Sequence, residues 1–90
     1  LILAAWADHV AVMDLLLAAG ANPDFPDEYG ETALFWAAGS GRKDAVRRLL
    51  AAGADPARRG REGATALDAA RAAGYDDIVA LIEEALARRR

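Results

Sequence analysis

The stretch that decides the fold is Gly30-Glu31-Thr32-Ala33-Leu34, which returns 33 residues later as Gly63-Ala64-Thr65-Ala66-Leu67. The same offset relates Ala19-Gly20-Ala21 to Ala52-Gly53-Ala54 and Pro23 to Pro56. Loop residues and apolar residues therefore share one period. A period of this length is typical of a stacked repeat protein, in which each unit buries its apolar face against its neighbours. Such arrays mostly bind partners, because stacking leaves one continuous surface free.

Each unit is predicted to hold two short antiparallel helices. In the middle unit Thr32 suits an N-cap, residues 33–38 carry the first helix, and Gly41 can adopt the left-handed conformation that ends it. The second helix is predicted to begin near Asp44, whose carboxylate suits the positive end of the helix dipole, and to stop at Gly53. The polar segment 57–62 then predicts a hairpin-like turn. The sequence thus predicts an all-α array with projecting loops.

The middle unit closely resembles an ankyrin repeat, in its Gly-x-Thr start at Gly30, its alanine pair Ala37-Ala38 and its Gly-Ala-Asp exit at Gly53. The resemblance implies an ankyrin-repeat solenoid of stacked helix-turn-helix units with projecting β-turn-like loops. It covers the whole chain as a single domain, residues 1–90. Its parts are a truncated repeat at 1–26, a complete repeat at 27–59 and a C-terminal capping repeat at 60–90. Because the first repeat lacks the Gly-x-Thr-Ala turn, we expect the natural protein to continue before Leu1.

Two departures from the family pattern bear on stability. Ala33 and Ala66 stand where the family usually has proline, so the first helices lose a preorganised start. Phe35 and Asp68 stand where it usually has histidine, so the hydrogen bonds that the histidine makes between neighbouring loops are expected to be absent and local stability to be lower. We expect Phe35 and its neighbour Trp36 to lie in the core, because they sit on the helix beside the alanines.

Composition excludes several classes of partner. Apolar residues make up 54% and charged residues 28%, which argues against a disordered tail. A net charge of −3 predicts no binding to nucleic acid or to an anionic membrane surface. No apolar run approaches the roughly 20 residues that a membrane-spanning helix needs. The absence of cysteine does not indicate whether the protein belongs to an oxidising or a reducing compartment. As a separate expectation, we place the protein in the cytoplasm.

The inventory of reactive side chains argues against an enzyme. The chain has one histidine, His9, one serine, Ser40, and no cysteine, so a nucleophile with a base and an orienting group would have to be assembled from unrelated faces. His9 is expected to be a turn residue between two helices. The pairs Asp76-Asp77 and Glu83-Glu84 point in different directions from one helix and form no acid–base site. We therefore expect no catalytic residues, no metal, no cofactor and no small-molecule substrate.

By the resemblance, a partner protein is bound through the loop tips and the concave side of the first helices. Aromatic anchors are typical of binding hot spots, and the first half of the chain supplies three of them, whereas the second half supplies arginines. The predicted partner-binding residues are Trp6, Phe25, Glu28, Tyr29, Glu31, Ser40, Arg58, Arg59, Arg61 and Glu62. Trp6 and Phe25 have a second interpretation, in which they pack against a neighbouring repeat.

The function that these observations favour is a non-catalytic protein–protein interaction module. Two alternatives stay open at this point. The chain could be the regulatory or targeting segment of a larger protein with an upstream catalytic domain. It could also be a purely structural end cap of a longer repeat array, in which case the aromatic residues of the concave side would be dispensable.

Overall fold

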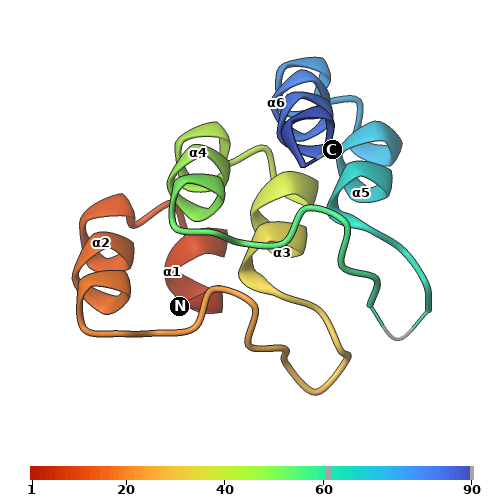
Figure 1. Ribbon diagram of the computed structural model, residues 1–90. Helices are drawn as coiled ribbons and strands as arrows, with labels where there is room; N and C mark the ends of the chain where they lie inside the picture. Colours follow the sequence, from red (N-terminus) through yellow and green to blue (C-terminus); the bar gives the residue numbers. More distant parts are fainter. Residues whose placement is uncertain (61, 90) are drawn as a thin grey trace.

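The computed structural model describes residues 1–60 and 62–89 as three helix pairs (Figure 1). The helices are α1 (Ile2–Trp6), α2 (Val10–Ala18), α3 (Ala33–Gly39), α4 (Lys43–Ala51), α5 (Ala66–Ala73) and α6 (Asp76–Arg88). No strand occurs in the part of the chain that the structure describes. The second helix of the middle pair begins at Lys43 and ends at Ala51, beside the predicted limits at Asp44 and Gly53. The all-α repeat architecture is confirmed.

The six helices form two rows (Figure 1). The first helices α1, α3 and α5 pack side by side in one row, and the second helices α2, α4 and α6 form the other. The loops 19–32 and 52–65 leave the ends of α2 and α4, cross below the helices and project beyond the row of first helices before they enter α3 and α5. None of the helices in the described ranges has the length and apolar character that a bilayer crossing requires.

Small side chains in the first helices and larger ones in the second helices build the core. Ala37, Ala38 and Ala70 are fully buried, and because alanine adds only a methyl group, α3 can approach both α1 and α5 closely. The space between the two rows is filled by branched and unbranched aliphatic side chains. The largest fully buried ones are Met13, Leu34, Val46, Leu49, Ile78 and Ile82. The apolar period of the sequence therefore becomes one continuous core that runs through all three units.

The ends of the first helices follow the predicted turn chemistry, whereas Thr32, the predicted N-cap, precedes α3 without a side-chain capping hydrogen bond. Gly41 and Gly74 both adopt positive φ, 75° and 80°, directly after the first helices. The first unit has Asp8 at the same position with φ 63°, a conformation that is less favourable for a residue with a side chain. Thr65 and Asp68 form a reciprocal capping box at the start of α5, which the sequence reading did not predict.

The expectation that Phe35 and Trp36 lie in the core is wrong. Both side chains are only half-buried and lie outside the cluster of buried residues. Their rings meet edge to face, with centroids 5.7 Å apart. The Trp36 indole Nε1 donates a hydrogen bond to Asp27 Oδ2 at 2.8 Å. A buried tryptophan needs a partner for its N–H, and here that partner lies on the loop, which draws the ring to the edge of the core.

Candidate protein-binding surface

The first projecting loop is organised by the carboxylate of Asp27. Its Oδ1 accepts hydrogen bonds from the backbone N–H groups of Tyr29 at 2.9 Å and Glu31 at 3.0 Å. Its Oδ2 accepts the Trp36 indole hydrogen bond, and its own N–H donates to the Glu31 carbonyl oxygen at 2.8 Å. One side chain therefore fixes the turn, and through Trp36 it ties the turn to α3. Tyr29 and Glu28 are exposed on this turn, with Tyr29 57% accessible.

The second loop has the same backbone turn without the aspartate. Gly60 occupies the position of Asp27 and donates from its N–H to the Ala64 carbonyl oxygen at 2.9 Å. Here the extra support comes from Arg59, whose Nη1 donates to the Gly63 carbonyl oxygen at 2.7 Å. Arg58, Arg59 and Glu62 are exposed, and their predicted role in binding stays a prediction. Arg61 lies outside the described residues, so its predicted role stays a prediction.

The two loops touch each other through Glu31. Its carboxylate lies so close to Gly60 that a Cβ on that glycine would overlap it. Desolvation in this contact raises the pKa of the Glu31 carboxyl, and the nearby charges of Asp27 and Glu62 raise it further. Glu31, predicted as a binding residue, is thus only half-exposed and packs against the neighbouring loop.

A second link joins the loops nearer the helices. Asp24 Oδ1 accepts a hydrogen bond from the Asp55 N–H at 2.8 Å. Phe35 and Asp68 replace the family histidines that link neighbouring loops, but the hydrogen bond between Asp24 and Asp55 links the two loops of this chain instead.

Trp6 and Ser40 lie at the opposite ends of the first helices from the loop turns. Trp6, the last residue of α1, is 51% exposed, and its carbonyl oxygen accepts a hydrogen bond from Arg42 Nε at 2.8 Å. Ser40 is the half-buried C-cap of α3. The rise of an α-helix over the seven residues of α3 is about 10 Å, so a partner that contacts both Trp6 and the loops must span about that distance.

Phe25 lies on the first loop, before the turn that Asp27 organises. It is 71% exposed and lines a mostly apolar groove with Leu1, Ile2 and Leu3, to which the first loop and Ala33 at the start of α3 also contribute. The structure therefore divides the predicted aromatic set. Tyr29 belongs to a loop turn and Trp6 to the end of a first helix, whereas Phe25 belongs to the groove between the first loop and the start of α1.

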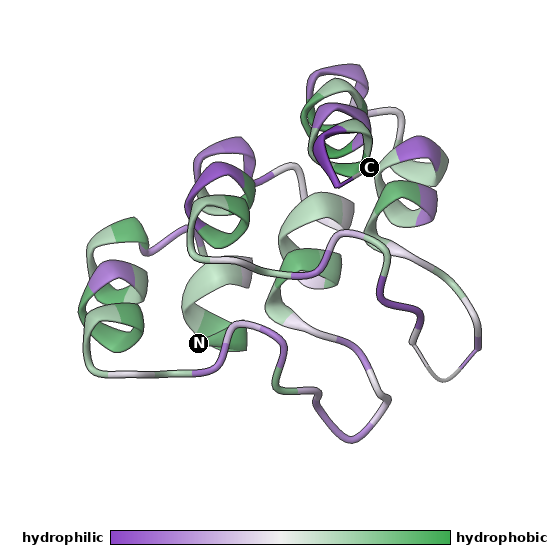
Figure 2. Ribbon diagram, viewed as in Figure 1, coloured by the Kyte–Doolittle hydropathy of each residue, from purple (hydrophilic) through white to green (hydrophobic). Residues whose placement is uncertain are grey.

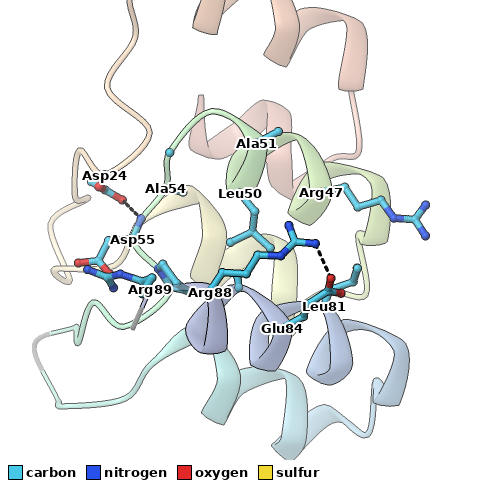
Figure 3. A pocket seen from close by; sticks show the side chains of 13 residues that line it. Asp24, Arg47, Leu50, Ala51, Ala54, Asp55, Leu81, Glu84, Arg88 and Arg89 are labelled. Atoms are coloured by element: carbon cyan, nitrogen blue, oxygen red, sulfur yellow. Dashed lines mark hydrogen bonds and ion pairs between the residues drawn. The ribbon is translucent and has the colours of Figure 1, made fainter.

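A groove between α4 and α6 was not predicted (Figure 3). Leu50, Ala54 and Leu81 contribute to its apolar lining, and ion pairs lie beside them. Arg88 pairs with Glu84 at 2.5 Å, and Arg89 pairs with Asp55. The C-terminal arginines were interpreted from the sequence as charges that suit the end of the helix dipole, and the structure adds carboxylate partners for two of them.

Other contacts between units were also missed by the sequence reading. Arg42 reaches back to Trp6, and one repeat later the Tyr75 ring lies over Gly41, where a Cβ would come within 2.8 Å of Cζ. Asp27 carries a signal that could have been used, since an aspartate three residues before a glycine is typical of a turn whose side chain accepts local backbone hydrogen bonds. No cluster of metal-binding side chains occurs among residues 1–60 and 62–89.

The geometry first defines the class of protein to which the chain belongs. A stack of helix pairs with projecting, mutually linked turns is a repeat protein whose unit is 33 residues long. A family model described as ankyrin repeats (3 copies) matches residues 1–87, and the chain belongs to this family. No curated protein matches the chain. Repeats of this family are generally protein–protein interaction modules and are typically non-catalytic.

Proposed function

We propose that this chain is a non-catalytic module that binds a protein partner through its loop turns and the exposed ends of its first helices. The observation that carries the proposal is the exposure of two large aromatic side chains, Tyr29 and Trp6, on elements whose backbones are fixed by specific hydrogen bonds. A rigid aromatic side chain loses little conformational entropy when it is buried, which is why such residues dominate binding energies. Smaller residues, Gly39 and Ala72, occupy the Trp6 position in the other two repeats.

Charge gives the two loops different roles. The first loop carries Asp24, Asp27, Glu28 and Glu31 and no basic residue, whereas residues 58–62 include three arginines and one glutamate. Exposed arginines at a loop tip attract an acidic partner before contact is made. The partner that fits is a protein surface with an apolar ridge for the aromatic side chains and an acidic patch for Arg58 and Arg59.

The experiment uses binders selected from a displayed library of protein fragments on the immobilised chain, with affinities measured by surface plasmon resonance. Trp6→Ala and Tyr29→Ala should each weaken binding by about 2 kcal/mol or more, which is the usual hot-spot threshold. Arg58→Ala should mainly lower the association rate and its dependence on salt. Arg59→Ala is a less clean test, because Arg59 also holds the Gly63 carbonyl.

The matched control is Arg47→Ala. Arg47 is exposed on α4 in the row of second helices, where its charge pairs with Asp44 at 3.6 Å. If Arg47→Ala abolishes binding while the Trp6 and Tyr29 variants bind normally, the assignment of the surface is wrong. If the selected binders keep the parent affinity for the variants Trp6→Ala, Tyr29→Ala, Arg58→Ala and Arg59→Ala, the alternative of a purely structural end cap is favoured.

Two finer predictions belong to the same proposal. The boundaries after residues 26 and 59, and a cytoplasmic location, stay predictions. The regulatory or targeting alternative is decided by the natural protein to which this chain belongs, because that alternative requires a catalytic domain upstream.

A further inference from the structure

The groove between α4 and α6 is a second surface that could hold a partner (Figure 3). Its volume is about 750 Å³, and Leu50 of α4 and Leu81 of α6 contribute half-buried apolar side chains to its lining. Figure 2 shows that α4 and α6 each carry both hydrophobic and hydrophilic residues. The groove therefore combines an apolar lining with charged side chains.

The walls of the groove all belong to the two repeats that it separates. α4 ends at Ala51, the equivalent of Glu84 in α6, and α6 continues for another turn to Arg88. This extra turn and the segment 53–56 after α4 complete the lining. A unit stacked on the third repeat would pack against the side of α5 and α6 that faces away from α3 and α4. The groove therefore does not depend on a neighbouring unit at either end of the stack.

The equivalent place between the first two repeats is bridged by an ion pair. There Arg48 of α4 pairs with Asp14 of α2. Between α4 and α6 the same two positions hold Leu81 and Arg47, which cannot form an ion pair. The second boundary therefore exposes a leucine and an arginine where the first boundary has a salt bridge.

The carboxylates of the groove already have partners within the chain. Glu84 pairs with Arg88 at 2.5 Å, and Asp55 pairs with Arg89. Asp24 accepts the hydrogen bond from the Asp55 N–H. A cationic partner would have to compete with these contacts, which makes a positively charged segment a poor fit.

Arg47 gives the groove a position for an added carboxylate. Its ion pair is with Asp44, three residues earlier on α4 and outside the groove, at 3.6 Å between two exposed side chains. An exposed pair of this kind contributes little free energy, so the guanidinium can exchange it for a partner at small cost. In Figure 3 the Arg47 side chain extends outward, away from the pair of Arg88 and Glu84.

We propose that this groove binds a helical segment of a partner protein, with apolar side chains over Leu50 and Leu81 and a carboxylate paired with Arg47. The backbone groups of α4 and α6 are hydrogen-bonded within their helices, so an extended segment would find no ladder to join. A helix brings its own satisfied backbone and needs only side-chain contacts. The proposal does not depend on the proposed function, because Trp6 and Tyr29 lie on a first helix and a loop turn.

The probe is a synthetic alanine-rich helical peptide of about 15 residues, since shorter isolated helices are marginal in water. It carries leucines on one face and a glutamate beside each leucine, and a second peptide has lysine in place of every glutamate. Binding to the isotope-labelled full chain is followed through amide chemical shifts. The acidic peptide should shift the amides of Leu50, Ala54 and Leu81 most, and it should bind at least about tenfold more tightly than the lysine peptide.

Two variants separate the apolar contribution from the charge. Arg47→Asp combined with Leu81→Arg restores the residues of the first boundary, Asp14 and Arg48, and is thus compatible with the fold. This double variant should weaken binding of the acidic peptide by at least about tenfold, because it bridges the groove and places a carboxylate where the peptide brings its own. Arg47→Gln alone should remove most of the preference for the acidic peptide over the lysine peptide.

The matched control is Arg71→Gln, the same substitution at an exposed arginine of α5 that pairs with Glu83 at 3.1 Å outside the groove. This control and Tyr29→Ala should bind the acidic peptide like the parent, and circular dichroism should show the same helix content in every variant. Equal affinities for the two peptides, parent-like binding by the double variant, or shifts confined to residues outside the groove would each overturn the proposal. It would also be overturned if the chain alone, on concentration, shifted the same amides, since a second copy would then be the occupant.

Discussion

Val12 and Ile78 occupy the same position of the second helix in the first and third repeats, yet Val12 is 47% exposed and Ile78 is 2% exposed. The difference lies in the neighbours. Ile78 is part of the core where α6 packs against α5 and α4, whereas α2 packs against α1 and α4 and leaves Val12 exposed. At the other end of the stack, Glu83 and Arg71 form an ion pair where the earlier repeats have apolar residues in the second helix. The stack therefore has an apolar surface on its first repeat and a polar, ion-paired surface on its third repeat.

The comparison teaches that burial in a repeat protein belongs to the boundary between two units rather than to the unit itself. A repeat supplies one half of each boundary, and its stability depends on the half that its neighbour supplies. The first three of the four experiments that follow compare equivalent positions, so each of these could break or sharpen the contrast between the units.

The largest difference is expected for removal of an aliphatic side chain at the two equivalent positions. Ile78→Ala should lower the free energy of unfolding by about 2–5 kcal/mol, because it leaves a cavity in a filled core. Val12→Ala should cost less than about 1 kcal/mol, since much of that side chain is already in contact with water. Urea unfolding followed by circular dichroism measures both values. Equal losses would show that the first repeat is packed as tightly as the third.

Overpacking of the first helices should give the next largest effect. Ala37 and Ala70 are fully buried where helices approach closely, so Ala37→Leu and Ala70→Leu should each cost about 1–3 kcal/mol. Ala4, the equivalent residue of α1, is 8% exposed and lies in the end unit, and Ala4→Leu should cost less than either. Thermal unfolding measures the order. Melting temperatures that match the parent for Ala37→Leu and Ala70→Leu would show that the repeat register is wrong.

A smaller difference is expected between the caps of α3 and α5. Thr65 Oγ1 accepts a hydrogen bond from the Asp68 N–H at 3.2 Å, and Thr65 N–H donates to Asp68 Oδ2 at 2.9 Å. Thr32 makes no side-chain capping bond, and Phe35, which stands where α5 has Asp68, has no carboxylate to accept the reciprocal bond from the Thr32 N–H. Thr65→Val keeps the shape but loses the cap and should cost about 1 kcal/mol, whereas Thr32→Val should cost less. Denaturant midpoints decide, and a larger loss for Thr32→Val would contradict the assignment of the cap.

The smallest effects on stability are expected from two carboxyl groups whose pKa values are shifted in opposite directions by folding. The backbone hydrogen bond from Thr65 lowers the pKa of Asp68, so this group stabilises the folded chain above its unfolded pKa and the gain is lost as pH falls through the folded pKa. The pKa of Glu31 is raised, mainly by desolvation, so the folded chain binds this proton more tightly and stability falls as pH rises through the folded pKa.

These signs are tested by measuring unfolding free energy as a function of pH for two variants. Asp68→Asn should reduce the loss of stability on acidification, and Glu31→Gln should increase it relative to the parent. The expected changes are small because Asp68 is exposed and Glu31 only partly covered. Parallel pH profiles for the parent and both variants would show that neither contact is formed in solution.

Much of the fold could be predicted because the same residues recur at equivalent positions in more than one repeat. The 33-residue period, the glycines after the first helices and the alanine pair in α3 located the two helices of the middle repeat to within about two residues. Local chemistry alone is sufficient there, since a left-handed turn favours glycine at Gly41 and close helix packing favours alanine at Ala37. The exposure of Tyr29 and of Arg58 was also predicted, because both lie in polar turn segments.

The failures share one cause. Phe35 and Trp36 look like core residues along the helix, but the position of Asp27 in space draws Trp36 towards the loop. Glu31 looks like a free loop residue, but the missing side chain at Gly60 lets its carboxylate pack against the next loop. Phe25, predicted to bind a partner or to pack against a neighbouring repeat, stays 71% exposed on the loop and lines a groove with Leu1 and Leu3, which the sequence did not specify. In each case the partner lies in a different element, which a periodic pattern does not specify.

The sequence by itself determined the period, the family, the helix pairs and the types of residue offered at each turn, because these follow from short-range sterics, helix propensity and apolar spacing. Only the tertiary structure decided which of several equivalent positions is buried. Val12, Ala45 and Ile78 satisfy the same pattern, and their exposure differs because burial depends on the unit that stands next to them. The apolar N-terminal end and the ion-paired C-terminal end are therefore properties of the stack as a whole.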